Sequence, residues 1–378
     1  MPQVPGRRAV NGGVLTRREL NRALLARQYL LEPAPPGTTV ESVLTHLLGL
    51  QAQSPYPPYL ALWSRMAQVA PLDLSVLLES RRAVRLALQR STVHLVTAED
   101  ALALRPVLQP AVARGLTPGS PYGRALAGVD RELLARRARE LVEERPLTTA
   151  ELGAALVREL PGRDPTALGM AARVDLALVQ VPPRGLWGRS GRSACTSAEH
   201  WLGRPMAAEP DPDGLVLRYL AAFGPATPAD MQAWSGLTRL AAVFERLRPR
   251  LCTWTSEDGA ELFDVPDAPR PPGDTPAPVR LLAEWDSVLL GHRDRSRIMD
   301  EDVRRQVFTE NGIIRGGVLL DGFVQGAWKV RWTPSTAGAE VEPLSAWSRD
   351  DRAAVDTEVR RALGWLAPGG RHTVQWSA

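Results

Sequence analysis

The sequence predicts an α+β protein that consists of three similar units in tandem and a β-rich C-terminal domain. In each unit, stretches with apolar residues at helical spacing are followed by two short β-like runs, and this order occurs three times along the chain. Beyond a proline-rich segment near residue 270 the pattern changes, and apolar runs of strand length dominate. With 378 residues the chain is long enough for several units that each bury a core.

The first unit, residues 15–115, begins with two helix-start signals. Thr16 and Glu19 have the T-x-x-E spacing of a capping box, and Thr38 and Glu41 repeat it after a Pro-Pro-Gly breaker. We expect the first helix to end before Pro33 and the second to lead into a short polar segment at residues 49–54. Two further helices and two β-like runs complete the unit: Tyr56–Met66, Leu72–Ser80, Val84–Leu88 and Val93–Val96. Helices closed by a β-hairpin are typical of a winged helix.

The same order returns in residues 129–204 and 213–266. In the second unit we expect helices at Asp130–Glu143, from Thr148 and at Thr166–Leu178, then β-like runs at Val179–Val181 and Gly185–Cys195. In the third unit we expect helices at Leu215–Phe223, from Thr227 and at Leu237–Leu247, then runs at Leu251–Ser256 and Leu262–Val265. The spacing varies too much for a solenoid, so the sequence predicts three separate winged modules that pack on one another.

The two ends of the chain differ in composition from these units. Residues 267–278 are rich in proline and are predicted to be a linker, and residues 279–378 are predicted to form a β-rich domain. Its expected elements are strands at Val279–Trp285, Val288–Leu290, Ile313–Leu320, Phe323–Trp328 and Val374–Trp376 and a helix at Asp350–Leu366. Residues 1–14 are short, polar and contain glycine and proline, so we predict a disordered leader.

The charge balance permits nucleic acid as a partner without requiring it. The formal net charge is +4, and Lys329 is the only lysine among 46 basic residues. Arginine supplies forked donors that suit phosphates and guanine edges, although a GC-rich genome also explains the bias. Cys195 and Cys252 lie far apart, and none of the five histidines belongs to a metal-binding motif. With no secretory or membrane-spanning run either, we expect a reduced, cytoplasmic protein without metal or cofactor.

The segment Gly49-Leu50-Gln51-Ala52-Gln53-Ser54 carries the most distinctive chemistry in the sequence. In an extended backbone, residues two apart project to the same side, so Gln51 and Gln53 could address one target. A neutral amide offers two donors and an acceptor, which suits it to orient a water molecule or to bind a polar base edge. The alternative is that both side chains satisfy backbone groups in a turn between helices.

Four segments in this order resemble the AlkZ/YcaQ family of winged-helix DNA glycosylases, and the resemblance extends from Leu15 onward. They are Gly49–Gln53, Arg90–Asp100, Pro182–Gly188 and Trp285–Arg297. The resemblance implies three tandem winged helices in a C-shaped arrangement with a β-domain, and duplex DNA bound on a basic concave face. It also implies monofunctional excision of N7-alkylguanine and the unhooking of interstrand crosslinks.

The first of these segments resembles the catalytic Q-Φ-Q motif of the family, which implies that Gln51 holds the attacking water. Gln53 would share that water or stabilise the sugar. Alkylation at N7 makes guanine a cationic leaving group, so neutral amides are chemically adequate for the rest of the reaction. Broad crosslink-unhooking members show Q-Φ-D, whereas the AlkZ branch, associated with self-resistance to alkylating antibiotics such as azinomycin B, shows Q-Φ-Q. We therefore expect a resistance glycosylase.

Six further side chains are candidate DNA contacts, each with a structural alternative: Thr92, His94, Arg184, Arg293, Arg295 and Arg297. Thr92 and His94 share a strand face, where a lone histidine is equally well a core residue. Arg184 precedes Trp187, so its stem could simply pack on the ring. The last three arginines alternate in a segment expected to be extended, so they could form a phosphate clamp or a solvated ion-pair cluster, and Asp286 could orient one of them.

Two rival functions stay open at this point. Winged helices bind DNA far more often than they cut bonds, so a non-catalytic transcriptional regulator is the first alternative. A drug-sequestering protein is the second, and it would need a closed apolar pocket instead of a basic face. For the enzyme we expect double-stranded DNA as the partner, no membrane association and a monomer.

Overall fold

The computed structural model describes residues 11–377. The first part of the molecule, residues 17–116, contains the predicted helices and hairpin. Thr16 forms the expected capping box with Glu19. Strands β3 and β4 are antiparallel, so the predicted hairpin is confirmed. The sequence analysis did not predict α5, which contains Pro106 and Pro110. The elements are α1 (Arg17–Arg27), α2 (Val40–His46), β2 (Leu50–Gln51), α3 (Pro57–Arg65), α4 (Pro71–Glu79), β3 (Ala83–Ala87), η1 (Gln89–Ser91), β4 (Val93–Thr97), α5 (Ala98–Val112) and η2 (Ala113–Leu116).

The second part contributes a helical lobe and two strands. Its elements are α6 (Pro121–Ala125), α7 (Arg131–Glu144), α8 (Thr149–Glu159), α9 (Pro165–Asp175), β5 (Leu178–Gln180), β6 (Cys195–Ser197) and α10 (Ala198–Leu202). The strand predicted at Gly185–Cys195 is wrong, because residues 181–194 form a loop. Two prolines begin this loop, and Gly185 and Gly188 have φ of +95° and +65°, which a strand cannot accommodate. Strand β5 pairs with β3, giving one sheet of order β2-β4-β3-β5-β6.

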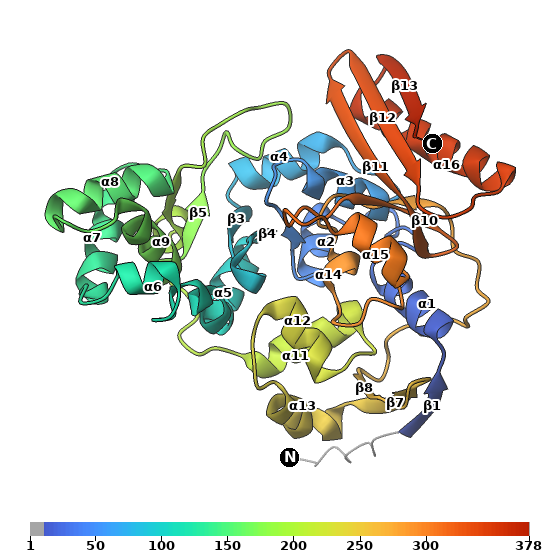
Figure 1. Ribbon diagram of the computed structural model, residues 1–378, viewed down its shortest axis with the longest axis horizontal. Helices are drawn as coiled ribbons and strands as arrows, with labels where there is room; N and C mark the ends of the chain where they lie inside the picture. The colour runs from blue at the N-terminus through green and yellow to red at the C-terminus, as the bar shows by residue number, and fades with distance from the viewer. Residues whose placement is uncertain (1–10, 378) are drawn as a thin grey trace.

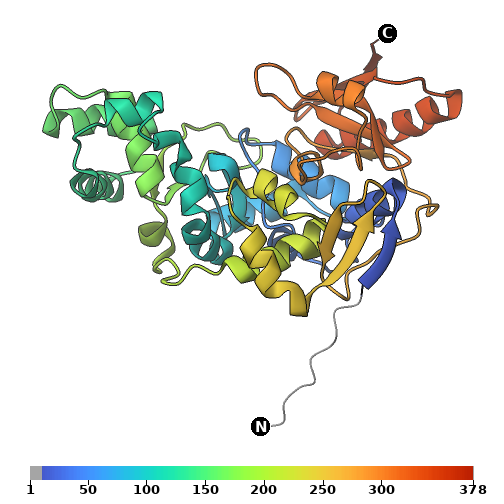
Figure 2. The same ribbon diagram turned by 60° about the horizontal axis from the view of Figure 1, so that its bottom comes forward.

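The third part ends in a small sheet that recruits the N-terminal segment. Its elements are α11 (Pro212–Phe223), α12 (Pro228–Ser235), α13 (Ala241–Leu247), η3 (Arg248–Arg250), β7 (Cys252–Ser256) and β8 (Glu261–Asp264). Strand β1 (Asn11–Leu15) lies parallel to β7 along the edge of this sheet (Figure 2). The expectation of disorder over residues 1–14 is therefore wrong for residues 11–14, because the free edge of β7 provides backbone partners. Residues 1–10 of the expected leader lie outside the described residues.

The C-terminal part is a five-stranded sheet of order β13-β12-β11-β10-β9 with helices beside it. Its elements are β9 (Arg280–Leu281), α14 (Ser287–Leu290), α15 (Glu301–Val307), β10 (Gly316–Leu320), β11 (Phe323–Thr333), β12 (Thr336–Pro343), α16 (Arg349–Leu366) and β13 (Arg371–Trp376). The strand predicted at Val288–Leu290 is wrong: the Asp286 side chain accepts from Val288 N and begins the short helix α14. Most of the strand expected at Val279–Trp285 is also absent, since only β9 pairs.

The parts surround the β2-β4-β3 strands (Figure 1). Helices α7–α9 lie on one side, the C-terminal sheet with α16 on the other, and α11–α13 along a third. One hydrophobic cluster contains residues of α1, α5, α11–α13, α14, α15 and β10, so the first, third and C-terminal parts share a core. No helix among residues 11–377 is long and apolar enough to cross a membrane.

Two buried ion pairs connect these parts. Arg27 binds Asp264 and Arg65 binds Asp286, at 2.7 and 2.6 Å, with all four side chains fully buried. The expectation that Asp286 orients an arginine of the 293–297 segment is therefore wrong. Its two carboxylate oxygens accept from both terminal nitrogens of Arg65 on α3, a bidentate geometry that only the tertiary packing makes available.

Candidate active site

The two glutamines are presented by an extended segment that lies against β4. Gly49 has φ of +88°, and a Cβ at this position would lie 2.7 Å from the carbonyl oxygen of Leu95. Only glycine allows the chain to leave α2 and pair so closely with β4. Gln51 lies opposite His94 in the antiparallel register, and the Ala52 amide donates to Val93 O at 2.7 Å. The backbone is thus extended at Gln51, whereas Gln53 lies in a bend just beyond β2.

Both amide side chains are held through their oxygens. Gln51 Oε1 accepts from an Arg90 terminal nitrogen at 2.8 Å, and Gln53 Oε1 accepts from Val93 N at 3.2 Å. A guanidinium and a backbone N–H can only donate, so these contacts determine which end of each amide is the oxygen. Within residues 11–377 neither Nε2 has a hydrogen-bond partner. The pair therefore offers N–H donors, while each oxygen keeps one lone pair.

The two glutamines differ in exposure. Gln51 is 8% exposed, whereas Gln53 is exposed to solvent. A buried amide with a fixed oxygen can hold one molecule in a defined position, and an exposed neighbour can reach a substrate that arrives from outside. Gln53 is therefore accessible to a reactant from outside, whereas Gln51 is largely enclosed by the protein.

His94 and Thr92 do not present groups for phosphate binding. His94 is 4% exposed, its Nδ1 lies 3.0 Å from Thr92 O, and burial together with Arg90 lowers its pKa to about 3. The imidazole is therefore neutral at physiological pH. Thr92 Oγ1 donates to Gln89 O at 2.9 Å. These contacts fit the structural alternative for both residues.

Arginines without a carboxylate partner surround the motif, and the sequence reasoning missed them. Arg85 is 2% exposed and donates to Ala52 O at 2.7 Å, and half-buried Arg173 donates to Ser91 O at 3.1 Å. Neither of them, nor Arg90, has an ion-pair partner among the described residues. Burial lowers the pKa of Arg85 and of Arg90 to about 10, so both stay charged at neutral pH. The surroundings of the glutamines are therefore positive, which favours a polyanion such as DNA.

Arg184 lies in the loop of residues 181–194, and its side chain is not free in solvent. The side chain is half-buried, one terminal nitrogen donates to Gly191 O at 3.2 Å, and Nε is buried without a hydrogen-bond partner. This arrangement fits the packing alternative better than a groove contact.

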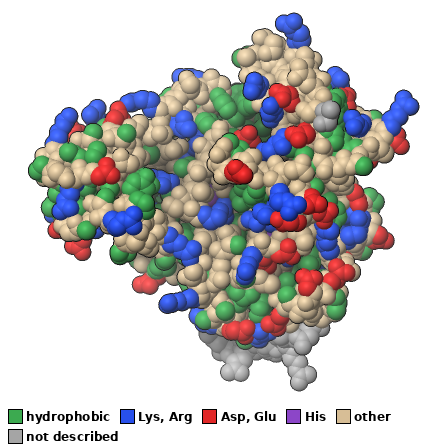
Figure 3. Space-filling model, viewed as in Figure 1, with side chains coloured by type: hydrophobic (Ala, Val, Ile, Leu, Met, Phe, Trp, Pro, Cys, Tyr) green, Lys and Arg blue, Asp and Glu red, His purple; other side chains and the backbone are tan. Residues whose placement is uncertain are grey.

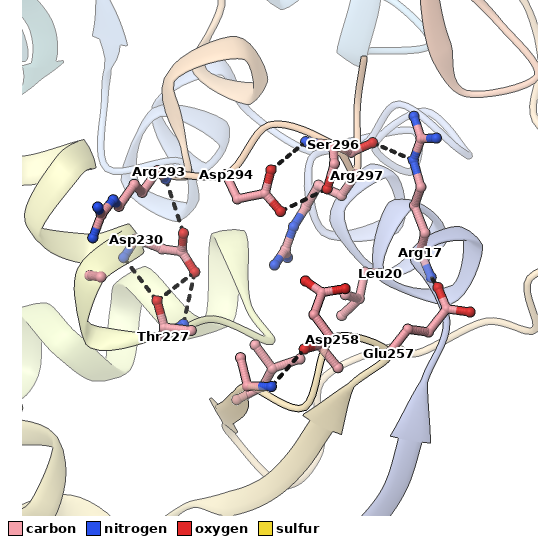
Figure 4. A pocket seen from close by; sticks show the side chains of 14 residues that line it. Arg17, Leu20, Thr227, Asp230, Glu257, Asp258, Arg293, Asp294, Ser296 and Arg297 are labelled. Atoms are coloured by element: carbon pink, nitrogen blue, oxygen red, sulfur yellow. Dashed lines mark hydrogen bonds between the residues drawn. The ribbon is translucent and has the colours of Figure 1, made fainter. Parts of the chain in front are cut away.

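The three arginines of the 293–297 segment do not share an exposed side, so that expectation is wrong: Arg293 is exposed, Arg295 is half-buried and Arg297 is buried. Figure 4 shows the side chains of Arg293 and Arg297 pointing in different directions. The segment turns, because Ile298 N donates to Arg295 O, and alternate residues then point in different directions. Arg297 is 7% exposed and donates to Pro225 O at 2.8 Å. Arg295 donates to Leu289 O at 2.9 Å and lies 4.8 Å over the Phe308 ring.

Arg293 keeps an exposed side chain beside a cavity of about 330 Å³. Its backbone N donates to the Asp230 carboxylate at 2.9 Å, and no bond from its guanidinium is present within the described residues. Asp230, Asp258 and Asp294 also line the cavity, so its charge is mixed. Figure 3 shows a hollow between the helical lobe (α6–α9) and the C-terminal sheet. Lys and Arg side chains lie on both sides of this hollow, interspersed with Asp and Glu. Of the three arginines, Arg293 is the one available to a phosphate.

The described residues offer neither a cluster of metal ligands nor, at Cys195, an activated thiol. Among residues 11–377 no group of three or more His, Cys, Asp or Glu side chains is placed to hold a metal ion. Burial raises the pKa of the Cys195 thiol to about 11, so it is not an activated nucleophile.

Comparison with known proteins gives a family and a fold. The family model described as DNA glycosylase AlkZ-like matches residues 44–365. The solved structure of the Streptomyces sahachiroi DNA glycosylase AlkZ is similar, with a TM-score of 0.77 and 20% sequence identity. The match covers 96% of this chain and 100% of that one. A search of curated protein sequences found no match.

Proposed function

We propose that this chain, which belongs to the AlkZ-like DNA glycosylase family and is a hydrolase of the N-glycosyl bond of DNA, releases N7-alkylguanine from duplex DNA. The proposal extends to unhooking of interstrand crosslinks and to self-resistance against an alkylating antibiotic such as azinomycin B. The observation that carries it is the neutral pair Gln51 and Gln53, held by their oxygens with free amide nitrogens.

The neutrality of the pair is what links it to a cationic lesion. An alkyl group on N7 leaves positive charge on guanine, so the base departs without a strong general acid. The enzyme then has to place water against the sugar as oxocarbenium character develops. In this scheme Gln51 holds that water between its Nε2 and the remaining lone pair of Oε1, and Gln53 shares the water or contacts the sugar. Such a site would act poorly on uncharged guanine, which needs a proton donor to leave.

The contacts to DNA are part of the same proposal. The three helix-plus-hairpin parts are taken as winged helices in a C-shaped arrangement around duplex DNA, with the protein acting as a cytoplasmic monomer. Arg293 is the proposed phosphate contact from the 293–297 segment, because its guanidinium is exposed. Replacing Arg293 with alanine should weaken binding to modified and plain duplex alike and reduce the salt slope by about 1. An unchanged slope would remove Arg293 from the interface.

The test of the proposal is release of a defined base. Purified protein is incubated in excess over a duplex with one N7-methylguanine, and free base and the remaining abasic duplex are quantified by chromatography. We expect release from this duplex, none from unmodified duplex, and no effect of EDTA, since the sequence has no metal-binding motif. A parallel arm with azinomycin-crosslinked duplex tests unhooking. Binding without base release from every N7-alkylated duplex would instead support the non-catalytic regulator.

A further inference from the structure

Arg90 joins the candidate catalytic strand to the third part of the molecule. One terminal nitrogen donates to Gln51 Oε1 at 2.8 Å, and the other donates to the carbonyl oxygen of Trp234 on α12. No carboxylate pairs with it among the described residues. The side chain is thus committed to one amide oxygen and one backbone oxygen.

The backbone at Arg90 is held as firmly as its side chain. Arg90 and Ser91 both have left-handed φ, at 52° and 59°, which non-glycine residues adopt only where the surroundings enforce it. Arg173 donates to Ser91 O at 3.1 Å. A Cβ at Gly236 would lie 3.2 Å from the N and Cα atoms of Arg90, so the chain after α12 packs directly on this turn.

We infer that Arg90 is a positioning residue for the excision step: it fixes the carboxamide of Gln51 and couples its orientation to α12. This inference rests on the proposed role of Gln51. A hydrogen bond from a cation is stronger than a neutral one and polarises the amide, so the free N–H groups become better donors. The same bond removes the rotation that would exchange the oxygen and nitrogen of Gln51. The water-holding end of Gln51 is then aimed before the substrate arrives.

Arg105 provides a matched control elsewhere in the chain. It is buried, whereas Arg90 is half-buried, and like Arg90 it has no carboxylate partner among the described residues. It donates to Gln109 Oε1 and to Val174 O. Burial lowers its pKa to about 10, as for Arg90. Replacing each arginine with methionine removes the same kind of contacts, but only Arg90 touches Gln51.

The experiment is a double-mutant cycle on single-turnover release of N7-methylguanine, with duplex affinity and thermal melting measured for each variant. We expect Arg90→Met to slow release by about tenfold to hundredfold with little change in affinity. In the Gln51→Ala background the same substitution should change the rate less than about threefold. Arg105→Met should leave the rate unchanged even if it lowers the melting temperature.

Two results separate this inference from the proposed function. If Gln51→Ala itself retains the wild-type rate, the catalytic assignment fails and the inference fails with it. If Gln51→Ala is slow but Arg90→Met slows both backgrounds equally, only the inference is overturned. Should Arg90→Met not fold, Arg90→Lys replaces it in the cycle, because lysine keeps the charge and loses the fork that serves both oxygens. Non-additivity with Gln51→Ala then supports the inference and additivity overturns it.

Discussion

Replacing Gln51 or Gln53 with alanine should have similar effects on catalysis but different effects on stability. Gln51→Ala removes the acceptor of a half-buried guanidinium, and a hydrogen bond to a charged group is worth about 1.5–3 kcal/mol. Gln53→Ala removes one neutral bond to Val93 N at an exposed position, where water can replace it, so about 0.5 kcal/mol is expected. The free energies of unfolding should therefore differ by about 1–2.5 kcal/mol.

For the chemical step, each alanine variant should lose about 100-fold in the single-turnover rate of N7-methylguanine release, the usual cost of one transition-state contact. Duplex affinity should stay nearly unchanged, because a contact made only in the transition state does not affect ground-state binding. The double variant should lose less than the product of the two factors, since both amides act on one water. Gln53→Asp should retain activity, because a carboxylate at this position can act as a base towards the attacking water.

The assay uses enzyme in excess over labelled duplex, a binding titration on the same duplex and denaturant unfolding for each variant. Wild-type release rates in both alanine variants would refute the reasoning and show that the amides are structural. If both variants lower the free energy of unfolding equally, the Arg90–Gln51 hydrogen bond does not stabilise the fold as expected. This result would not depend on the excision rates.

Three further tests address how the site and the surrounding fold are stabilised. Gly49→Ala should lower the free energy of unfolding by about 1–3 kcal/mol and slow excision, because the added Cβ would lie 2.7 Å from Leu95 O in a left-handed backbone. Wild-type values in the unfolding and release assays would contradict this. Asp286→Ala should cost about 3–5 kcal/mol by leaving the buried charge of Arg65 unpaired, and adding Arg65→Met should recover part of that loss. Burial lowers the pKa of His94 in the folded protein to about 3, against an ordinary value of 6.5. Below pH 6.5 the unfolded chain therefore binds a proton that the folded chain does not. The free energy of unfolding should fall as pH falls below 6.5, by up to about 1.4 kcal/mol per pH unit. His94→Gln should reduce this slope between pH 6.5 and 5 without abolishing it, because burial also lowers the pKa of His46 and of His292. An unchanged slope would show that His94 is not buried in its neutral form.

The sequence by itself determined the features that depend on neighbouring residues. The capping boxes at Thr16, Thr148 and Thr227 form, because each needs only a hydroxyl and a carboxylate three residues apart. The box expected between Thr38 and Glu41 does not form, because Thr39 caps α2 instead and accepts from Ser42 N. The β3–β4 hairpin and the pairing of the strands expected on either side of residues 321–322 are equally local. The candidate motif was also recognisable, since glycine before an extended Gln-Ala-Gln segment is a pattern of adjacent residues.

Only the tertiary structure decided which distant groups meet. Residues 11–14 and 185–194 were misassigned, because a strand forms only where a partner edge is available. Strand β7 offers such an edge to β1, whereas the loop with Pro182, Pro183 and left-handed glycines cannot pair as a strand. Alternate spacing places side chains on one side only in an extended segment. The 293–297 segment turns, and the third part of the molecule buries Arg297, so the three arginines do not lie together. The Arg90 contact to Gln51 joins residues 39 apart in the sequence, and its second contact reaches α12. Such contacts follow from how the sheet and helices pack, and no local pattern of residues encodes them.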